Sequence, residues 1–132
     1  MKKALTGFAF FFSIALSSSG FENVSAEEFS KLMKEKNILI LDVRTPEEYQ
    51  KDGHIKGANL IPVQLFRYIF LGGKGVKDKK VLVYCRSGNR SAVASKMLEQ
   101  WGVEKVYNLK GGIKEWKSKN FPVEYGFESS KK

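Results

Sequence analysis

The chain has 132 residues, a length that suits one compact domain with a short appendage. Hydrophobic residues make up 42% of it and include ten phenylalanines, which is enough for one core and excludes an intrinsically disordered chain. The formal net charge is +9, but the lysines are scattered and form no run interleaved with aromatic residues, so nucleic-acid binding is not predicted. The charge indicates either a solvated surface or a field that concentrates small anions near a site.

Residues 1–20 have the order of a secretory signal peptide. Lys2 and Lys3 form a short basic region, an apolar run over 4–16 follows, and small residues fill positions 17–20. The apolar run is shorter than the roughly 20 residues that a membrane-spanning helix needs. A buried first element of the domain and an uncleaved anchor are the alternatives. We expect an exported protein with no stable membrane span after cleavage.

Two helix starts stand out in the first half of the domain. Ser25 and Thr45 are each followed three residues later by a glutamate, Glu28 and Glu48, which is the capping-box pattern. Pro46 holds the first position of the second helix, where proline is favoured. The predicted elements are a helix through Phe29 to Met33, a buried strand over 38–41, a short helix that stops at 52–53 and a short strand over 59–62.

The second half alternates in the same way. The predicted elements are an aromatic-rich helical segment over 65–71, a solvated loop over 72–80, a buried strand over 81–84, a helix over 91–101, a strand over 103–109, a turn at 111–112 and a helix over 113–118. The helix over 91–101 has the clearest period, with Val93, Met97 and Trp101 four residues apart and Ala94 and Leu98 beside them. Alternating strands and helices indicate an α/β fold with a mainly parallel central sheet of about five strands and helices on both faces. This single domain is predicted over 21–126, with a flexible tail over 127–132.

Cys85 is the single cysteine of the chain and directly follows the buried strand over 81–84. It cannot form an internal disulfide, and an unpaired thiol in an oxidising compartment needs a use. An inert buried thiol and an intermolecular bridge are the alternatives. A tight loop that enters a helix beyond the end of a parallel strand presents successive N–H groups to an anion. Because such a cradle lowers the pKa of a thiol, Cys85 is predicted to be a thiolate nucleophile.

The residues after Cys85 are predicted to bind an anionic substrate, namely Arg86, Ser87, Gly88, Asn89 and Arg90. A guanidinium can bind an oxyanion through two hydrogen bonds. Gly88 admits backbone conformations closed to other residues, and Asn89 tolerates left-handed ones. A solvated loop charge is the alternative for Arg86, and a structural contact to loop carbonyls or to a carboxylate is the alternative for Arg90.

Four segments, in the right order, carry a resemblance to rhodanese-like domains. Residues 41–49 and 53–62 resemble the first hallmark of that family, 84–91 resembles its active-site loop, and 108–116 resembles its closing segment. The resemblance covers roughly residues 21–125. With its export signal, the chain is similar to the small single-domain periplasmic rhodaneses of bacteria, which implies a location in the bacterial periplasm.

The resemblance implies a sulfur transfer in two steps. The Cys85 thiolate would attack the sulfane sulfur of a small anionic donor such as thiosulfate, which would release sulfite and leave a persulfide. A thiophilic acceptor would then take that sulfur, and cyanide, a small thiol and a protein thiol are the candidates. The cycle needs no metal and no organic cofactor. In this family Asp42 and Arg44 mainly support the site by ion pairing, and His54 holds a structural loop position rather than the place of a general base.

The length of the loop separates sulfur transfer from rival chemistries. Four residues lie between Cys85 and Arg90, whereas related phosphatases and arsenate reductases of the same fold have five. The wider loop suits a tetrahedral oxyanion and the smaller one suits a terminal sulfur, so sulfur transfer is predicted. A persulfide carrier or binding module with little small-molecule turnover is the other alternative.

Overall fold

A computed structural model of the chain describes residues 20–127. The predicted signal peptide lies outside the described residues except for Gly20, and the predicted tail does so except for Phe127. Phe127 stacks on Tyr49 of the domain, with 5.6 Å between the two ring centroids. Within residues 20–127, no helix is long and apolar enough to cross a membrane.

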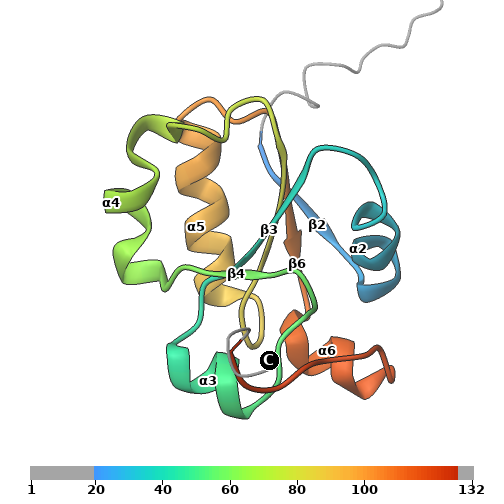
Figure 1. The fold of residues 1–132 in the computed structure, drawn as a ribbon. Coiled ribbons are helices and arrows are strands. Elements are labelled where there is room, and N and C mark those ends of the chain that lie inside the picture. Colours follow the sequence, from blue (N-terminus) through green and yellow to red (C-terminus); the bar gives the residue numbers. More distant parts are fainter. Residues whose placement is uncertain (1–19, 128–132) are drawn as a thin grey trace, which may run out of the picture.

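The centre of the molecule is a sheet of five parallel strands in the order β2-β6-β5-β3-β4 (Figure 1). The strands are β2 (Glu22–Val24), β3 (Ile38–Asp42), β4 (Asn59–Leu60), β5 (Lys80–Tyr84) and β6 (Lys105–Leu109). The predicted α/β fold is therefore confirmed. The sequence did not predict β2, because three residues of which two are exposed carry no periodic pattern. This strand exists through its pairing with β6.

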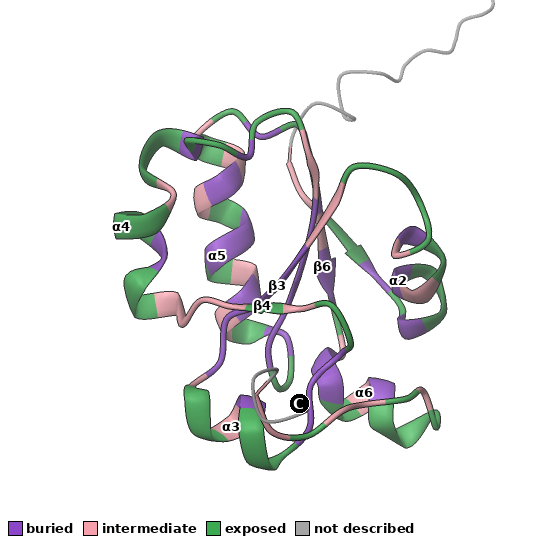
Figure 2. Cartoon of the chain, viewed as in Figure 1, coloured by how far each residue is buried: buried purple, intermediate pink, exposed green. Residues whose placement is uncertain are grey.

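Helices cover both faces of the sheet, as predicted. The helices α2 (Ala26–Leu32) and α6 (Gly112–Ser118) lie on one face, and α4 (Phe66–Ile69) and α5 (Asn89–Gln100) lie on the other (Figure 1). Successive strand residues point to opposite faces. Leu82 and Tyr84 of β5 therefore pack in the first layer, and Val81 and Val83 pack in the second. Figure 2 shows buried residues along the strands and on the inner sides of the helices.

Both predicted N-cap side chains accept their hydrogen bond, and of the two the structure gives the full capping box at Thr45. The Ser25 hydroxyl accepts a hydrogen bond from the Glu28 N–H at 3.1 Å at the start of α2. Thr45 and Glu48 form the full reciprocal capping box of α3 (Pro46–Lys51). In Figure 1, α3 lies beyond the sheet, at the end where the parallel strands finish. The second capping box is therefore placed at the edge where ligands bind in open α/β sheets.

The helix α5 differs from its prediction in its start and in its buried face. It begins at Asn89, two residues earlier than predicted, and it buries Ser91, Ala94, Ser95 and Leu98 against the sheet. Val93, which belongs to the apolar repeat of the sequence, is 53% exposed. Three of these four inward residues, Ser91, Ala94 and Ser95, are small, which suits close packing of α5 against the sheet.

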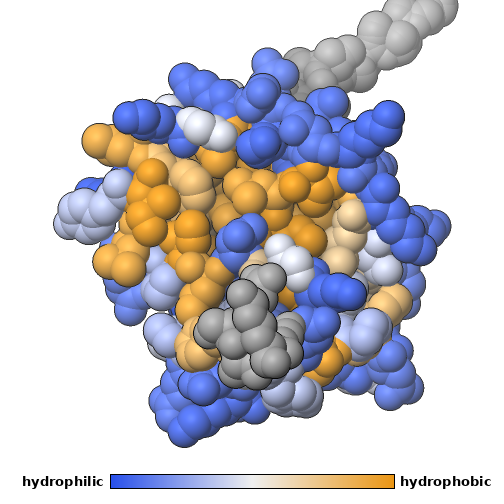
Figure 3. Space-filling model, in the orientation of Figure 1, coloured by the Kyte–Doolittle hydropathy of each residue, from blue (hydrophilic) through white to orange (hydrophobic). Residues whose placement is uncertain are grey.

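The segment between β4 and β5 is broken rather than being one helix. It consists of the short 3₁₀ helix η2 (Val63–Leu65), α4 and the short 3₁₀ helix η3 (Leu71–Gly73). Phe66 is buried, whereas Leu65, Tyr68, Ile69 and Leu71 are exposed. Figure 3 shows apolar side chains gathered over α4 and β4 on this face. The predicted solvated loop that follows is partly anchored, because Val76 is buried in the second core layer.

Candidate active site

Cys85 lies directly after β5, at the edge of the sheet where the parallel strands end. Its Sγ points back into the loop and is almost fully buried. Three donors reach it: the Gly88 N–H at 3.1 Å, the Ser91 N–H at 3.4 Å and the Ser91 hydroxyl at 3.3 Å. The loop therefore forms a cradle of hydrogen-bond donors around the sulfur, of the kind that stabilises an anion.

Two opposing effects act on the ionisation of this thiol. Burial raises the pKa of Cys85, while hydrogen bonds from the Ser91 hydroxyl and from the N–H groups of Ser91, Gly88 and Ser87 lower it. The hydrogen bonds prevail, so the pKa of Cys85 lies below its ordinary value. Because the thiolate is the nucleophilic form of cysteine, the cradle prepares Cys85 for attack on an electrophilic atom.

Two glycines let the turn between β6 and α6 sit directly on the loop. Gly88 has a φ of +102°, and a Cβ there would meet the Lys110 carbonyl oxygen at 2.2 Å. Gly112 has a φ of +68°, and a Cβ there would meet the Arg86 carbonyl oxygen at 2.0 Å. The Ile113 N–H donates to the Cys85 carbonyl oxygen at 2.9 Å. The predicted role of Gly88 in shaping the loop thus has a concrete cause, which is the close approach of a second backbone.

Arg90 is the last residue of the loop pattern and lies in the first turn of α5. Its two terminal nitrogens each donate to one carboxylate oxygen of Glu48 at 2.8 Å. The hydrogen bonds from Arg90 lower the pKa of Glu48 to about 2, against partial burial. The sequence left substrate binding and a carboxylate contact open for Arg90, and the structure shows the carboxylate contact. Arg90 therefore joins α5 to the capping box of α3.

Asp42 and Arg44 form a buried ion pair at the end of β3, where Asp42 is in register with Tyr84, the residue before Cys85. The Asp42 carboxylate accepts from Arg44 Nε at 2.9 Å and from Arg44 Nη2 at 2.7 Å, and both side chains are excluded from solvent. Burial works against the guanidinium charge, but the hydrogen bonds and charge of Asp42 outweigh it and raise the pKa of Arg44. A further bond from Nη2 to the Gly53 carbonyl oxygen at 2.7 Å ties the pair to the end of α3. The pair therefore holds β3 and α3 in place next to the loop.

The other predicted substrate-binding residues lie on the outer side of the loop. Arg86 and Ser87 are exposed, and Asn89 is exposed at the first position of α5. Asn89 does not use a left-handed conformation, because the positive φ values of non-glycine residues within 20–127 occur at Asn37 and Asn120. An open hollow of about 380 Å³ adjoins the loop, with Arg86 on its wall. A small anion can approach the loop from this side.

His54 takes a structural position. Its ring is buried, stacks on the Tyr49 ring with 3.7 Å between centroids, and lies with Nδ1 2.9 Å from the Tyr49 carbonyl oxygen. Its backbone pairs with that of Glu124. These contacts fasten the segment that follows α6 to α3, and they do not involve the Cys85 loop.

Comparison with known proteins decides the family. The model of the rhodanese-like domain matches residues 25–119. The chain belongs to this family. A protein named sulfurtransferase from Allochromatium vinosum is 36% identical over 101 residues, which cover 76% of this chain and 92% of that protein. The thiosulfate sulfurtransferase GlpE of Coxiella burnetii is 34% identical over 98 residues, which cover 74% of this chain and 89% of that protein.

A solved structure agrees with this assignment. The crystal structure of a rhodanese-related protein from Thermoplasma volcanium has 33% sequence identity and a TM-score of 0.66, and the match covers 78% of this chain and 97% of that one. This rhodanese-like chain thus shares its fold with a protein of nearly the same extent, and both named relatives are sulfurtransferases of comparable size.

Three residues that shape this rhodanese-like site were not predicted from the sequence. Ser91, Glu48 and Gly112 lie within the segments that resemble the family, but they were predicted to have no role at the site beyond a helix start, a cap and part of a turn. Ser91 has a recognisable signal, because it is a polar residue on the inward face of α5, one turn above Gly88. Within residues 20–127, no group of three or more His, Cys, Asp or Glu side chains is placed to hold a metal.

Proposed function

We propose that this protein is an exported sulfurtransferase that moves a sulfane sulfur from a donor such as thiosulfate to a thiophilic acceptor through a Cys85 persulfide. The observation that carries the proposal is the set of three hydrogen-bond donors within 3.4 Å of Cys85 Sγ. Sulfur transfer in general is supported by the rhodanese-like family and by its named sulfurtransferases. The identity of donor and acceptor is what the resemblance to this family implies, and we adopt it here as our own proposal.

The first step is an attack of the Cys85 thiolate on the outer sulfur of thiosulfate. A bond forms between Sγ and that sulfur, the sulfur–sulfur bond of thiosulfate breaks, and sulfite leaves with the electron pair. The N–H groups of Gly88 and Ser91 are placed to stabilise the negative charge that then lies on the persulfide. No general base is required, because the cradle already favours the thiolate.

The second step returns the enzyme to its starting form. A nucleophilic acceptor, cyanide or a thiolate, attacks the outer sulfur of the persulfide, and the electron pair of the broken bond returns to Cys85 Sγ. Arg86 and Ser87 are exposed at the outer side of the loop, and Arg86 lines the hollow that adjoins it. We assign both residues to substrate binding. Asp42 and Arg44 act at the end of β3 as the support of the loop.

Persulfide formation tests the proposal directly. The full chain is incubated with thiosulfate and its intact mass is measured, and we expect the addition of one sulfur atom. Cys85→Ser is expected to gain none, and an equal gain in that variant would show that another group is the nucleophile. Steady production of thiocyanate from cyanide is expected as well. A protein that loads but does not turn over would instead be a sulfur carrier, and efficient hydrolysis of an aryl phosphate would contradict sulfur transfer.

Export is proposed from the basic, apolar and small-residue order of residues 1–20. Expression in a bacterium followed by fractionation is expected to place a shortened chain in the periplasm. Phe11→Lys puts a charge in the apolar run and is expected to leave the precursor uncut in the cytoplasm. Processing that is unchanged in this variant would contradict a signal peptide.

A further inference from the structure

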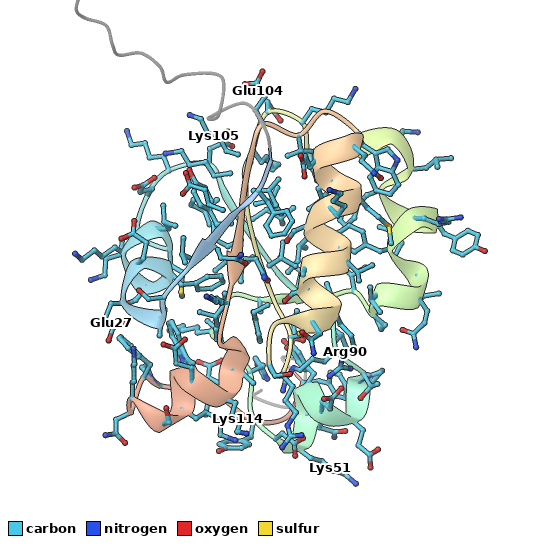
Figure 4. The ribbon with its side chains drawn as sticks, turned by 180° about the vertical axis from the view of Figure 1, so that it is seen from behind. Glu27, Lys51, Arg90, Glu104, Lys105 and Lys114 are labelled. Carbon is cyan, nitrogen blue, oxygen red and sulfur yellow. The ribbon has the colours of Figure 1, made fainter. Side chains whose placement is uncertain are left out.

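The hollow beside the Cys85 loop is bounded by α3, the loop and α6. Its wall includes Arg86 from the loop and Lys114 and Lys117 from α6. Lys114 and Lys117 are three residues apart and therefore lie on the same face of the helix. The Lys114 N–H also donates to the Arg86 carbonyl oxygen at 3.1 Å, so α6 and the loop are held together at this wall. Figure 4 shows Lys114 at the same end of the molecule as Arg90 of α5 and Lys51 of α3.

The charges on this wall do not cancel. The wall also includes Arg44 and Glu48, but Arg44 is neutralised by Asp42 and Glu48 by Arg90. Three further cations, Arg86, Lys114 and Lys117, then face one further carboxylate, that of Asp52.

None of these three cations is neutralised by an ion pair within the described residues. Within residues 20–127, neither Arg86 nor Lys114 makes an ion pair, and Lys117 Nζ donates to the backbone oxygen of Asp52 at 2.8 Å rather than to its carboxylate. A concave surface with a surplus of cations attracts anions and raises their local concentration.

We propose that this hollow is the binding site of the sulfur acceptor, and that the acceptor it selects is an anionic thiol, one whose carboxylate or sulfonate lies a few atoms from its sulfur. The proposal rests on the proposed function and adds the class of acceptor to it. Thiosulfate is small and must lie against the loop itself, whereas the hollow extends along α6 as far as Lys117 and has a volume of about 380 Å³. Volumes of this size accommodate molecules larger than the five atoms of thiosulfate.

The chemistry of the second step explains why cations are needed there. The acceptor thiolate forms a bond to the outer sulfur of the Cys85 persulfide, the bond between that sulfur and Sγ breaks, and the electron pair returns to Sγ. The acceptor leaves as a persulfide. Both reactants are anions, so they repel each other on approach. Lys114 and Lys117 offset this repulsion by binding the distant anionic group of the acceptor.

The test separates the two half-reactions and uses three thiols of similar size. The full chain is loaded with thiosulfate, freed of donor, and then mixed with 2-mercaptoethanesulfonate, 2-mercaptoethanol or cysteamine, while intact mass follows the loss of sulfur. Each thiol is compared only with itself across the variants, because the three differ in thiolate fraction. We expect Lys114→Gln and Lys117→Gln each to slow unloading by the sulfonate about fivefold. This factor corresponds to the loss of one attraction between opposite unit charges about 4 Å apart in water. Unloading by the neutral thiol is expected to stay unchanged.

Lys119→Gln is the matched control. This substitution removes the same charge from the protein as Lys114→Gln does. Lys119 directly follows α6, but its side chain pairs with Glu27 at 3.0 Å and with Glu115 at 2.8 Å and does not line the hollow. Its variant is expected to behave like the unchanged protein. If it slowed the sulfonate as much as Lys114→Gln does, the general field of the protein would be responsible and the proposed site would be wrong.

The remaining outcomes are also decisive. If thiosulfate loads the protein normally and the rate of unloading by the sulfonate does not change in the lysine variants, the acceptor site is wrong and the proposed function stands. Slower loading by thiosulfate in Lys114→Gln, without slower unloading, would make the hollow a donor site and overturn the inference. A protein that does not load at all would overturn the proposed function and this inference with it.

Discussion

Ser91→Ala removes one of the hydrogen bonds that hold the Cys85 thiolate. The Ser91 hydroxyl lies 3.3 Å from Cys85 Sγ and is fully buried. Alanine at this position keeps the backbone N–H of residue 91 and the helix propensity of α5. The change therefore withdraws a single donor from the cradle and leaves its geometry in place. Because this hydroxyl helps to lower the pKa of Cys85, its loss is expected to raise that pKa.

The size of the effect follows from the bond that is lost. Hydrogen bonds to charged groups contribute about 1.5–3 kcal/mol, and we take the lower end because sulfur is a weak acceptor. A loss of about 1.5 kcal/mol corresponds to about tenfold less thiolate at pH values below the pKa of the thiol. At high pH, where both proteins are fully ionised, the difference in thiolate disappears. The reactivity of Cys85 in the variant is thus expected to reach the same maximum, but at a higher pH.

The rate of alkylation by iodoacetamide, measured as a function of pH, reports the thiolate of Cys85. Ser95→Ala is the matched control, because the Ser95 hydroxyl lies one turn further along α5, is buried, and has no hydrogen-bond partner within residues 20–127. Its removal is expected to leave the alkylation profile unchanged and to be neutral or stabilising for the fold. A Ser91→Ala profile that overlays the unchanged protein, or an equal displacement in Ser95→Ala, would refute the role of the Ser91 hydroxyl.

Three predictions concern the frame of the site, and urea unfolding measures each of them. The low pKa of Glu48, about 2 against an ordinary 4.5, means that its ion pair stabilises the fold above about pH 4.5 and is lost as the pH falls toward 2. Glu48→Gln is therefore expected to lower the free energy of unfolding by about 1–2 kcal/mol at pH 7, a small value because water screens a partly exposed pair. A loss of the same size at pH 2 would contradict this account. Gly112→Ala is expected to cost about 2–5 kcal/mol through its clash and its positive φ. Gly75→Ala, at φ +83° with nothing within 4 Å, should cost about 1–2 kcal/mol, so equal losses would argue against the clash. Asp42→Asn leaves a buried guanidinium without its carboxylate and should cost about 3–5 kcal/mol, and a loss below 1 kcal/mol would mean that the buried pair does not support the loop.

The fold was predicted well where the signal is local. The cap residues Ser25 and Thr45 located two helices, since a cap is a contact between residues three positions apart, and Thr45 forms the full capping box. The apolar run of β5 was recognisable because it is covered on both faces. The strand β2 was not predicted, because its three residues become a strand only by pairing with β6. The predicted face of α5 was correct at Ala94 and Leu98, which are buried, and at Met97 and Trp101, which pack against the core. Val93 is exposed, however, and Ser91 and Ser95 take inward positions that an apolar repeat does not reveal.

The amino-acid sequence by itself determined that Cys85 lies in a tight turn between a buried strand and a helix, with glycine and arginine after it. These features depend on neighbours within a few residues, and local patterns record them. Only the tertiary structure decided which groups meet around the sulfur. Arg90 donates hydrogen bonds to Glu48, 42 residues earlier in the chain, and the absence of a Cβ at Gly112 lets the start of α6 pack against the loop. Such contacts follow from the order of the strands and the closeness of the backbones, which no periodicity in one segment can encode.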